Sequence, residues 1–367
     1  MSEVRVGLEE PEAVRACLDE LTESDEERAY ARLMLPRYIM ALDLVEGLLE
    51  RRLRMGVEDP AIVDVAPHLL TELFSRAFSV RIHTIGARFR DLPGERRGGE
   101  HLDLDLNSLH EHAGWRGFHR GDVVFMGEIL EHLHASPRMV LGCASRWIRD
   151  DGYLVVQTPN AVALDRRLTL LLGSNPYDMI REGSDPGHFR EYTAREVERM
   201  GAYWGLEHES TSFANYFRLP HRRGMKRLLY GFVSGLRPTL RDGMTIVFRR
   251  PAGTPDPRAT SRDIRGHVEG LAVRDGWLIV QGWAVDLLKP GPVGLVELVH
   301  SGHTFHGAVP DLDRPDVVRA LGGEEAFLRC GFRMEAPLPA DFEPANLIAR
   351  TRDIFGDWYD LPPPDVP

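Results

Sequence analysis

The sequence predicts an α/β domain, in which helices cover a mostly parallel sheet, followed by a smaller all-β sandwich domain. Two observations support this fold class. Apolar strand-like runs alternate with amphipathic helical stretches between residues 61 and 249, a pattern typical of βαβ units. After residue 262, short alternating runs follow one another, separated by Gly and Pro turns, with a single short helix near 315–321.

Length and composition limit the function classes. A chain of 367 residues with 43% hydrophobic residues is long enough for two domains, each with its own core. The net charge of −11 opposes attraction to nucleic acid or to an anionic membrane surface. The three cysteines are too few and too widely spaced for a disulfide framework. No run approaches the roughly 18 apolar residues of a membrane span, so we expect a cytoplasmic protein without a membrane or nucleic-acid partner.

The individual elements of the first domain follow from periodicity. Residues 1–58 are expected to be a helical lead-in, because Ile39, Leu42, Val45 and Leu49 recur at helical spacing. The α/β domain is assigned to residues 59–250, with predicted strands at 62–66, 80–85, 122–126, 153–158, 206–211 and 243–249. Helices are expected near 69–78, 136–149 and 161–172, and the capping box from Thr193 to Glu196 opens another.

The first strand runs into a turn that has no glycine. A dinucleotide-binding turn normally uses glycines so that the backbone can approach a pyrophosphate. Here the turn is Ala66-Pro67-His68, followed by a helix that begins near Leu69. The turn therefore disfavours a diphosphate ligand and leaves open a cofactor without phosphates.

Polar residues follow other predicted strands at the same edge of the sheet. Asp105 and Leu106 precede a loop, the strand 122–126 runs into Gly127-Glu128 and on to His132, and the strand 153–158 runs into Pro159-Asn160. Ligands of open α/β sheets bind outside the carboxyl ends of the strands. These loops therefore predict a binding site.

With these segments, residues 35–250 resemble the class I S-adenosylmethionine-dependent methyltransferases, a Rossmann-like family. The matching positions are Asp64, Asp105-Leu106, the stretch from Asp122 to His132, and Asp151-Gly152 leading into Asn160. The chain is most similar to a bacterial branch that accompanies polysaccharide and secondary-metabolite enzymes. In that branch a Pro-containing turn replaces the glycines, and a motif like Gly187-His-Phe-Arg-Glu-Tyr-Thr193 follows the fifth strand.

The resemblance implies S-adenosyl-L-methionine as the cofactor. By position, the backbone of the turn would face the methionine part, Asp105 would accept the adenine amino group, and Leu106 would cover the ring. The implied cofactor-binding residues are Asp64, Ala66, Pro67, His68, Thr71, Asp105, Leu106, Gly127 and Glu128. An acidic residue that should end the second strand is replaced by Thr84-Ile85-Gly86. Either Thr71 or Glu72 binds the ribose instead, or the cofactor binds weakly.

Two histidines are the candidate general bases for a hydroxyl acceptor, because a neutral imidazole can remove its proton near pH 7. His132 follows the fourth strand, and His188 lies in a later loop. Arg190, Glu191 and Tyr192 are candidates for orienting the base or the acceptor. For the histidines the alternative is a structural role, such as a histidine on a helix face bonded to a neighbour.

We expect no metal site. The dense histidines His101, His110, His112, His119, His132 and His134 lack a ligand spacing with a known mechanism, such as two histidines four apart beside a glutamate on one helix. A solvated loop explains them more simply.

Residues 251–262 are interpreted as a linker and residues 263–367 as a β-sandwich accessory domain. The pairs Gly282-Trp283 and Gly331-Phe332 resemble a β-rich module found with polysaccharide glycosyltransferases and methyltransferases. We expect Trp277, Trp283 and Phe332 to pack in its core.

The sequence thus favours a methyltransferase that acts on a hydroxyl group of a sugar, a glycan or a related small molecule. Two alternatives remain at this point: a noncatalytic methyltransferase-like scaffold in polysaccharide assembly, and methylation at nitrogen or carbon. The acceptor and the oligomeric state have no readable residue code, so a homo-oligomer is left open.

Overall fold

The computed structural model describes residues 4–87, 98–109, 118–177, 179–181, 187–216, 224–256, 264–287, 291–339, 341–352 and 358–363. Within these residues the chain forms two compact units, one ending at Pro255 and the other beginning at Asp256. The first is built on a mostly parallel sheet with helices and the second on antiparallel strands, which confirms the predicted fold class.

The first unit contains a seven-stranded sheet in the order β3-β2-β1-β4-β5-β7-β6. Its strands are β1 (Ala61–Val65), β2 (Arg81–Ile85), β3 (His101–Leu102), β4 (Gly121–Gly127), β5 (Ile148–Pro159), β6 (Glu207–Ala214) and β7 (Gly243–Arg249). The pairs from β3 to β5 are parallel, whereas β7 is antiparallel to both of its neighbours. Because β4 lies between β1 and β5, the carboxyl ends of these three strands meet at one edge of the sheet.

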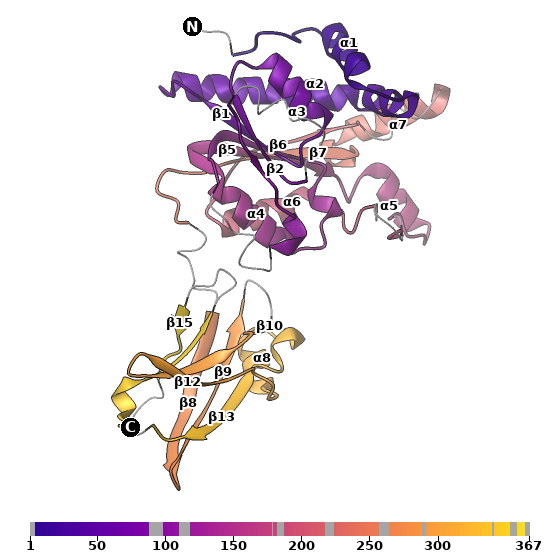
Figure 1. Ribbon diagram of the computed structural model, residues 1–367. Coiled ribbons are helices and arrows are strands. Elements are labelled where there is room, and N and C mark those ends of the chain that lie inside the picture. The colour runs from indigo at the N-terminus through magenta and orange to yellow at the C-terminus, as the bar shows by residue number, and fades with distance from the viewer. Residues whose placement is uncertain are drawn as a thin grey trace. The chain divides into compact units, whose positions relative to one another are not determined.

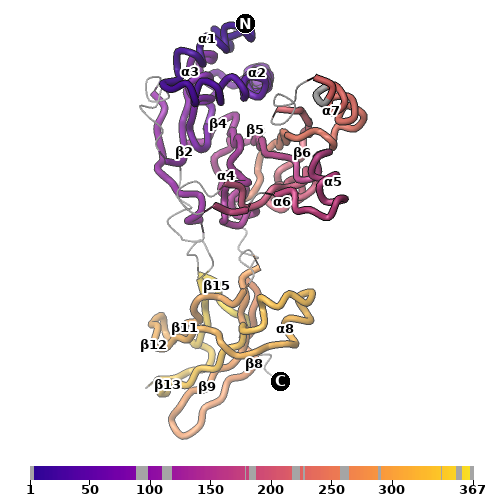
Figure 2. Tube along the Cα trace, turned by 90° about the vertical axis from the view of Figure 1, so that its right-hand side faces the viewer, coloured from indigo at the N-terminus to yellow at the C-terminus, as the bar shows by residue number. Residues whose placement is uncertain are grey.

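Helices cover both faces of this sheet (Figure 1). The helices α1 (Pro11–Leu21), α2 (Asp25–Arg54) and α3 (Leu69–Ala77) share a core with the strands, in which Leu42, Phe74 and Phe125 are fully buried. The helices α4 (Pro137–Arg146) and α6 (Ala194–Tyr203) lie on the opposite face. Figure 2 shows the same layers from the side. The remaining helices are α5 (Leu164–Leu171) and α7 (Gly224–Leu236), with single 3-10 turns at Leu106–Ser108, Leu130–His132 and Pro238–Leu240.

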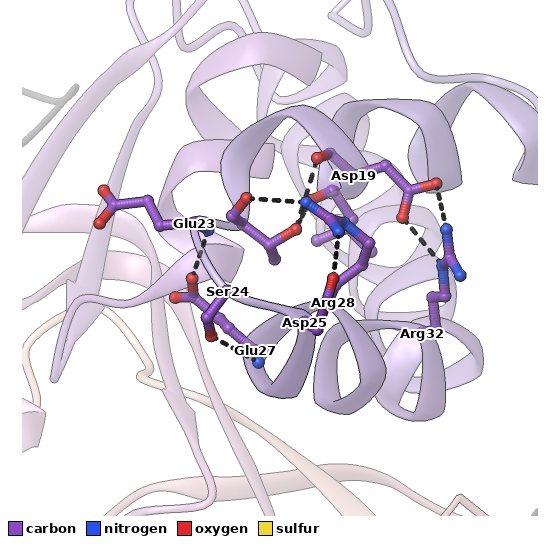
Figure 3. Close-up of polar contacts among 9 residues, drawn as sticks. Asp19, Glu23, Ser24, Asp25, Glu27, Arg28 and Arg32 are labelled. Atoms are coloured by element: carbon purple, nitrogen blue, oxygen red, sulfur yellow. Dashed lines mark hydrogen bonds and ion pairs between the residues drawn. The ribbon is translucent and has the colours of Figure 1, made fainter.

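The predicted lead-in is a helical hairpin that polar contacts fix at its turn (Figure 3). The hydroxyl of Ser24 accepts a hydrogen bond from the Glu27 backbone N–H at 3.0 Å, which caps α2. Arg32 on α2 donates two hydrogen bonds, at 2.9 and 3.0 Å, to the carboxylate of Asp19 on α1. The hairpin therefore holds α2 in one orientation against the sheet, with its residues 30–37 near the carboxyl ends of β4 and β5.

At the amino end of β4 a buried charge is fully paired. Asp122 has no exposed surface and accepts hydrogen bonds from Arg52 Nε at 2.9 Å and from Arg149 Nη1 at 2.7 Å. It also accepts one from the backbone N–H of Ala61 at 2.9 Å. The last turn of α2 is thereby tied to β1, β4 and β5.

The second unit is a sandwich of two antiparallel four-stranded sheets. One contains β8 (Ile264–Arg274), β9 (Trp277–Asp286), β10 (Gly291–Pro292) and β13 (Gly331–Pro337); the other contains β11 (Val296–His300), β12 (His303–Ala308), β14 (Leu347–Arg352) and β15 (Trp358–Asp360). A common core joins them, with Leu278 and Phe332 from one sheet and Leu298 and Ala349 from the other. The described residues of the unit also form the helix α8 (Pro315–Ala320) and 3-10 turns at Glu325–Phe327 and Pro344–Asn346.

The expected core role holds for two of the three aromatic residues for which it was predicted. Phe332 is buried, and Trp283 packs against a second small cluster around Val285 and Phe327. The expectation was wrong for Trp277, which is 49% exposed. Its position beside the Asp275-Gly276 turn, at the tip of the β8–β9 hairpin, explains the exposure.

Differences from the predicted elements are local. The helix expected from residue 161 begins at Leu164, because the backbone N–H of Ala161 donates to the Tyr192 carbonyl and that of Val162 donates to the Asn160 side chain. Predicted residues His110 and His112 lie outside the described part of the chain. Among the helices of the described residues, none combines the length and the apolar content that crossing a bilayer requires.

Candidate functional site

A cavity of about 290 Å³ opens where the ends of β4 and β5 meet α2. Its lining comes from α2, from the loop after β4, from the segment that runs from the end of β5 into α5, from the loop before α6 and from the residue before β7. The lining residues are Tyr30, Met34, Glu128, His132, Pro159, Asn160, Ala163, Arg166, His188, Glu191 and Asp242. Most of these side chains are polar, so the cavity suits a polar ligand.

The two predicted histidines meet in this cavity, although 55 residues separate them. Their ring centroids lie 4.7 Å apart with the rings nearly perpendicular, at 86°. Nδ1 of His132 lies 2.9 Å from the carbonyl oxygen of Gly187, and Nδ1 of His188 lies 3.2 Å from Oε1 of Glu191. Since both partners are acceptors, each Nδ1 carries the proton and each Nε2 carries the lone pair.

The carboxylate that holds His188 is itself positioned by a buried arginine. Glu191 forms an ion pair with Arg166, whose side chain is only 10% exposed and which also donates to the carbonyl of Pro176. Arg166 comes from α5 and Glu191 from the loop before α6. The chain Arg166–Glu191–His188 therefore fixes the orientation of the imidazole.

Two acidic side chains lie beside the histidines. Glu131 has no exposed surface; its Oε2 accepts a hydrogen bond from the Thr158 hydroxyl at 2.9 Å, while its Oε1 has no hydrogen-bond partner. Burial and the charge of Glu128 raise the pKa of Glu131 well above its usual value. Burial also raises the pKa of Glu128, although the nearby charge of Arg37 opposes this effect.

The glycine-free turn after β1 has a left-handed residue where a glycine is usual. Ala66 has a φ of 56°, a conformation that costs a non-glycine residue about 1–2 kcal/mol. The glycine that allows two backbone segments to approach closely is Gly86, which follows β2. A Cβ atom at Gly86 would lie 3.2 Å from Cα of Ala66. Ala66 is exposed, although its backbone N–H donates to the Ile85 carbonyl at 2.7 Å, and the glycine follows the neighbouring strand.

Behind this turn the side chains of Asp64 and Thr71 and the backbone of His68 form a small network. The Thr71 hydroxyl donates to Oδ2 of Asp64 and accepts a hydrogen bond from the His68 backbone N–H at 2.8 Å. Oδ1 of Asp64 and Nδ1 of His68 are buried without hydrogen-bond partners. Burial raises the pKa of Asp64 to about 7 and lowers the pKa of His68 to about 3, so His68 is neutral at pH 7. The hydroxyl of Thr71 is thus engaged within the protein.

Arg37 of α2 joins the turn to the cavity. Its side chain is 1% exposed, with Nη1 3.6 Å from Oε1 of Glu128, and its Nε and Nη1 have no hydrogen-bond partner. Its charge also acts on Asp64 and His68. Arg37, Asp64, His68 and Glu128 therefore form one group of buried polar atoms with unsatisfied hydrogen-bonding capacity.

The remaining predicted residues lie at the edges of these sites. Asp105 is exposed and accepts a hydrogen bond from the Asn107 N–H at 2.9 Å, whereas Leu106 is buried. Gly127 ends β4, where a Cβ atom would lie 2.7 Å from Cε1 of Phe125. Pro67 is buried beneath the turn.

Arg190 and Tyr192 do not line the cavity that holds the histidine pair. Arg190 is exposed and forms an ion pair with Glu196 at 2.6 Å, and its guanidinium lies 5.2 Å from the ring centroid of the buried Tyr192. Arg190 does line a neighbouring cavity of about 480 Å³, which also has His188 and Glu191 in its wall. The two cavities therefore share residues of the loop before α6.

Several site residues escaped the sequence analysis, namely Arg37, Glu131 and Arg166, whereas Glu191 was expected to orient a base or the acceptor and does contact His188. The only available signal for Glu131 was its place beside His132 in the loop after the fourth strand. Arg37 lies on an otherwise ordinary amphipathic helix, and nothing in its sequence neighbourhood distinguishes it from the exposed arginines of that helix.

Solved structures with similar architecture include three methyltransferases. A SAM-dependent methyltransferase from Archaeoglobus fulgidus is 14% identical, with 57% of this chain and 94% of that chain covered and a TM-score of 0.35. An O-methyltransferase family protein from Burkholderia thailandensis is 16% identical, with 69% and 66% covered and a TM-score of 0.36. The N-methyltransferase NodS from Bradyrhizobium japonicum WM9, in complex with S-adenosyl-L-homocysteine, is 13% identical, with 65% and 98% covered and a TM-score of 0.36.

The chain matches no curated protein sequence. A family model does match the part of the first unit that begins at the turn after β1 and ends in β6. It includes the turn, the loop after β4 and the loop before α6. Residues 66–211 of this chain match the family model described as a methyltransferase domain.

Proposed function

We propose that this chain is an S-adenosylmethionine-dependent methyltransferase that methylates a hydroxyl group of a sugar, a glycan or a related small molecule. The observation that carries the proposal is the shared position of Glu128. It lies beside Arg37, next to the turn after β1, and it also lines the cavity that holds His132 and His188. A cofactor held at the turn and an acceptor held in the cavity would therefore meet.

The residues at the turn fit this cofactor. S-adenosylmethionine supplies a methyl group on a positively charged sulfur, which becomes a neutral thioether when the acceptor takes the methyl. The unpaired nitrogens of Arg37 suit the carboxylate of its methionine part, and the unpaired Oδ1 of Asp64 suits its ammonium group. The exposed Ala66 would border the same part, with Pro67, His68 and Gly127 around it. Asp105 and Leu106 would hold the adenine, and Thr71 acts by positioning Asp64.

The histidine pair provides the base. Nε2 of His132 or of His188 takes the proton of the acceptor hydroxyl, and the oxygen then forms its bond to the methyl carbon as the carbon–sulfur bond breaks. The electron pair of that bond remains on sulfur. The Gly187 carbonyl and the Glu191 carboxylate hold the two imidazoles with their lone pairs on Nε2. Proton transfer of this kind contributes about 10²–10⁴ to a rate.

The polar cavity supports a polyhydroxylated acceptor. Carboxylates of Glu128, Glu191 and Asp242 and the guanidinium of Arg166 line it, and such groups hydrogen-bond to sugar hydroxyls. The neighbouring 480 Å³ cavity, lined by Tyr177, Arg190 and Glu196 among others, extends the space for a larger acceptor. Arg190 and Tyr192 would orient the acceptor there, Arg190 directly and Tyr192 by supporting its guanidinium.

We further infer that residues 263–367 form an accessory domain joined by a linker at 251–262 to a methyltransferase domain at 59–250. Its two-sheet core supports the interpretation as an independent sandwich. The resemblance of its Gly-Trp and Gly-Phe pairs to a module of polysaccharide enzymes supports a role of the whole chain in cytoplasmic polysaccharide synthesis.

Calorimetry with S-adenosylmethionine and S-adenosylhomocysteine tests the cofactor assignment. Micromolar binding of both is expected, and no detectable binding by the folded chain would contradict the enzyme and leave the noncatalytic scaffold. Methyl transfer is then followed by mass spectrometry with a panel of monosaccharides, nucleotide sugars and oligosaccharides. Full activity of both His132→Asn and His188→Asn on a hydroxyl acceptor would refute the base assignment, and an amine or carbon acceptor would replace the hydroxyl.

A further inference from the structure

Three ligand-type side chains converge in the cavity at the carboxyl ends of β4 and β5. One ligand atom each from Glu131, His132 and His188 lies within 4.8 Å of the other two. Nε2 of His132 is 4.0 Å from Oε1 of Glu131. One ion bound at about 2.1 Å from an imidazole nitrogen and from a carboxylate oxygen spans up to about 4.2 Å between them. The observed 4.0 Å lies just within this limit, so one ion could be shared if it drew the side chains somewhat closer together.

The hydrogen bonds of the two histidines are those of metal ligands. A ligating histidine usually donates its other ring N–H to a backbone carbonyl or to a carboxylate, which fixes the tautomer and the ring orientation. His132 donates from Nδ1 to the Gly187 carbonyl, and His188 donates from Nδ1 to Glu191. Glu191 is in turn held by Arg166. Both lone pairs consequently lie on Nε2.

Among the described residues, the carboxylate of Glu131 is not paired with an arginine or a lysine. Arg37 pairs with Glu128 and Arg166 pairs with Glu191, but in the described part of the chain no guanidinium pairs with Glu131. Oε1 of Glu131 is fully buried without a hydrogen-bond partner, and it is the oxygen that faces His132. A buried carboxylate oxygen without a partner is costly, and a divalent cation would compensate both it and the neighbouring Glu128.

We propose that Glu131, His132 and His188 bind one divalent first-row metal ion, with Glu128 as a further carboxylate at its open side. Two imidazoles and a carboxylate with open positions suit Mn²⁺, Fe²⁺, Co²⁺ or Zn²⁺ better than Mg²⁺ or Ca²⁺, which prefer oxygen ligands. The expectation of no metal site came from the spacing of neighbouring histidines. The ligands instead come from two loops whose sequence separation carries no such signal.

The catalytic role of the metal ion rests on the proposed function, whereas the binding of the ion does not. In a methyltransferase that acts on a hydroxyl, an ion here would bind the acceptor and lower the pKa of its hydroxyl, so that the proton could be lost to solvent. When bound, the ion would replace the imidazole base proposed above, which applies to the metal-free site. His132 and His188 would then act through the metal. A catechol-like or vicinal pair of hydroxyls, which can chelate one ion, becomes the preferred acceptor class.

Direct metal binding by the full chain tests the inference without any turnover. The metal-free chain is titrated with MnCl₂ while the spectrum of free Mn²⁺ is followed by electron paramagnetic resonance, and Co²⁺ binding is followed by its visible absorption. One Mn²⁺ per chain is expected, displaced by Zn²⁺. Glu131→Gln and His188→Asn should each weaken binding at least about 100-fold, and Glu191→Gln, which removes the negative charge that faces His188 and pairs with Arg166, about 10–100-fold.

His134→Gln is the matched control, because this histidine lies two residues beyond His132 and outside the cluster. It should bind Mn²⁺ like the unaltered chain. The inference is overturned if the unaltered folded chain binds none of Mn²⁺, Co²⁺ and Zn²⁺, or if the variants of Glu131 and His188 bind as well as the control. The Co²⁺ absorption of the unaltered chain keeps the test valid if a variant does not fold. Calorimetry with S-adenosylhomocysteine, run in parallel, separates loss of this site from failure of the proposed function.

Discussion

Replacing Asp64 by Asn should change stability in a way that depends on pH. The Asp64 carboxyl has no exposed surface, and its Oδ1 has no hydrogen-bond partner. Burial raises its pKa from the ordinary 3.8 to about 7. Each pKa unit corresponds to about 1.36 kcal/mol, so this shift corresponds to about 4 kcal/mol in the free energy of unfolding.

The sign follows from which state holds the proton. Below pH 3.8 Asp64 is protonated in both the folded and the unfolded chain, so it does not change the free energy of unfolding. Between pH 3.8 and about 7 Asp64 loses its proton only in the unfolded chain, so the free energy of unfolding falls as the pH rises. Above about pH 7 the loss is complete. At pH 5 the unaltered chain has lost about 1.6 kcal/mol, and at pH 8 about 4 kcal/mol.

Asp64→Asn removes this titration but adds a buried amide. The Asn oxygen can accept the Thr71 hydrogen bond, while the amide N–H₂ without a partner costs about 1–3 kcal/mol. The variant should therefore be more stable than the unaltered chain by about 1–3 kcal/mol at pH 8 and about equally stable at pH 5. Cofactor binding should weaken in the same variant, because Asp64 is a proposed ligand.

Urea denaturation at pH 5 and pH 8 measures these differences. Asp122→Asn is the control, because Asp122 is equally buried but paired with Arg52 and Arg149. Removing one partner of a buried ion pair costs about 3–5 kcal/mol, so this control should be less stable at both pH values. An Asp64→Asn variant that is destabilised equally at both pH values would refute the reasoning.

Variants at three further positions test separate parts of the structure. Arg37→Met should weaken S-adenosylhomocysteine binding about 10–150-fold in calorimetry, because a hydrogen bond to a charged group contributes about 1.5–3 kcal/mol; unchanged affinity would exclude Arg37 from the cofactor site. Gly142→Ala should cost about 1–3 kcal/mol in urea denaturation, since its Cβ would lie 2.5 Å from Cε2 of Trp204, and an unchanged midpoint would show that α4 and α6 can separate. Ser24→Ala should cost about 0.5–2 kcal/mol through loss of the α2 cap, whereas Ser24→Asp should retain stability (Figure 3).

The sheet of the first unit was predictable because its strands are long apolar runs with helices between them. β4 and β5 are buried over most of their length, so their hydrophobicity alone marked them. The two-residue strand β3 could not be predicted, because its residues 101–102 are half-buried and its position depends on pairing with β2. The exposure of Trp277 escaped prediction for a similar reason, since an aromatic residue beside a hairpin turn has the same local sequence whether or not a second sheet covers it.

The site was only partly predictable, and the reason lies in how its residues are related. Glu128 and His132 lie in one loop, and position after a strand was enough to select them. The orientation of His188 depends on Glu191 and Arg166, and Glu128 pairs with Arg37 from the lead-in helix. These residues come together only in the folded chain, so their pairing has no local sequence signal. A metal site made of residues 131, 132 and 188 likewise has no local spacing to detect.

Buried charged side chains are paired differently at the amino ends and at the carboxyl ends of the parallel strands. At the amino end of β4, Asp122 has three donors and no unsatisfied oxygen. At the carboxyl ends of β1 and β4, oxygens of Asp64 and Glu131 and nitrogens of Arg37 are buried without partners. Each such group costs about 1–3 kcal/mol or more, so a sequence that only had to fold would pair them as it pairs Asp122. The unpaired groups are therefore best understood as ligand-binding capacity held ready, and a ligand that satisfies them should stabilise the first unit when it binds.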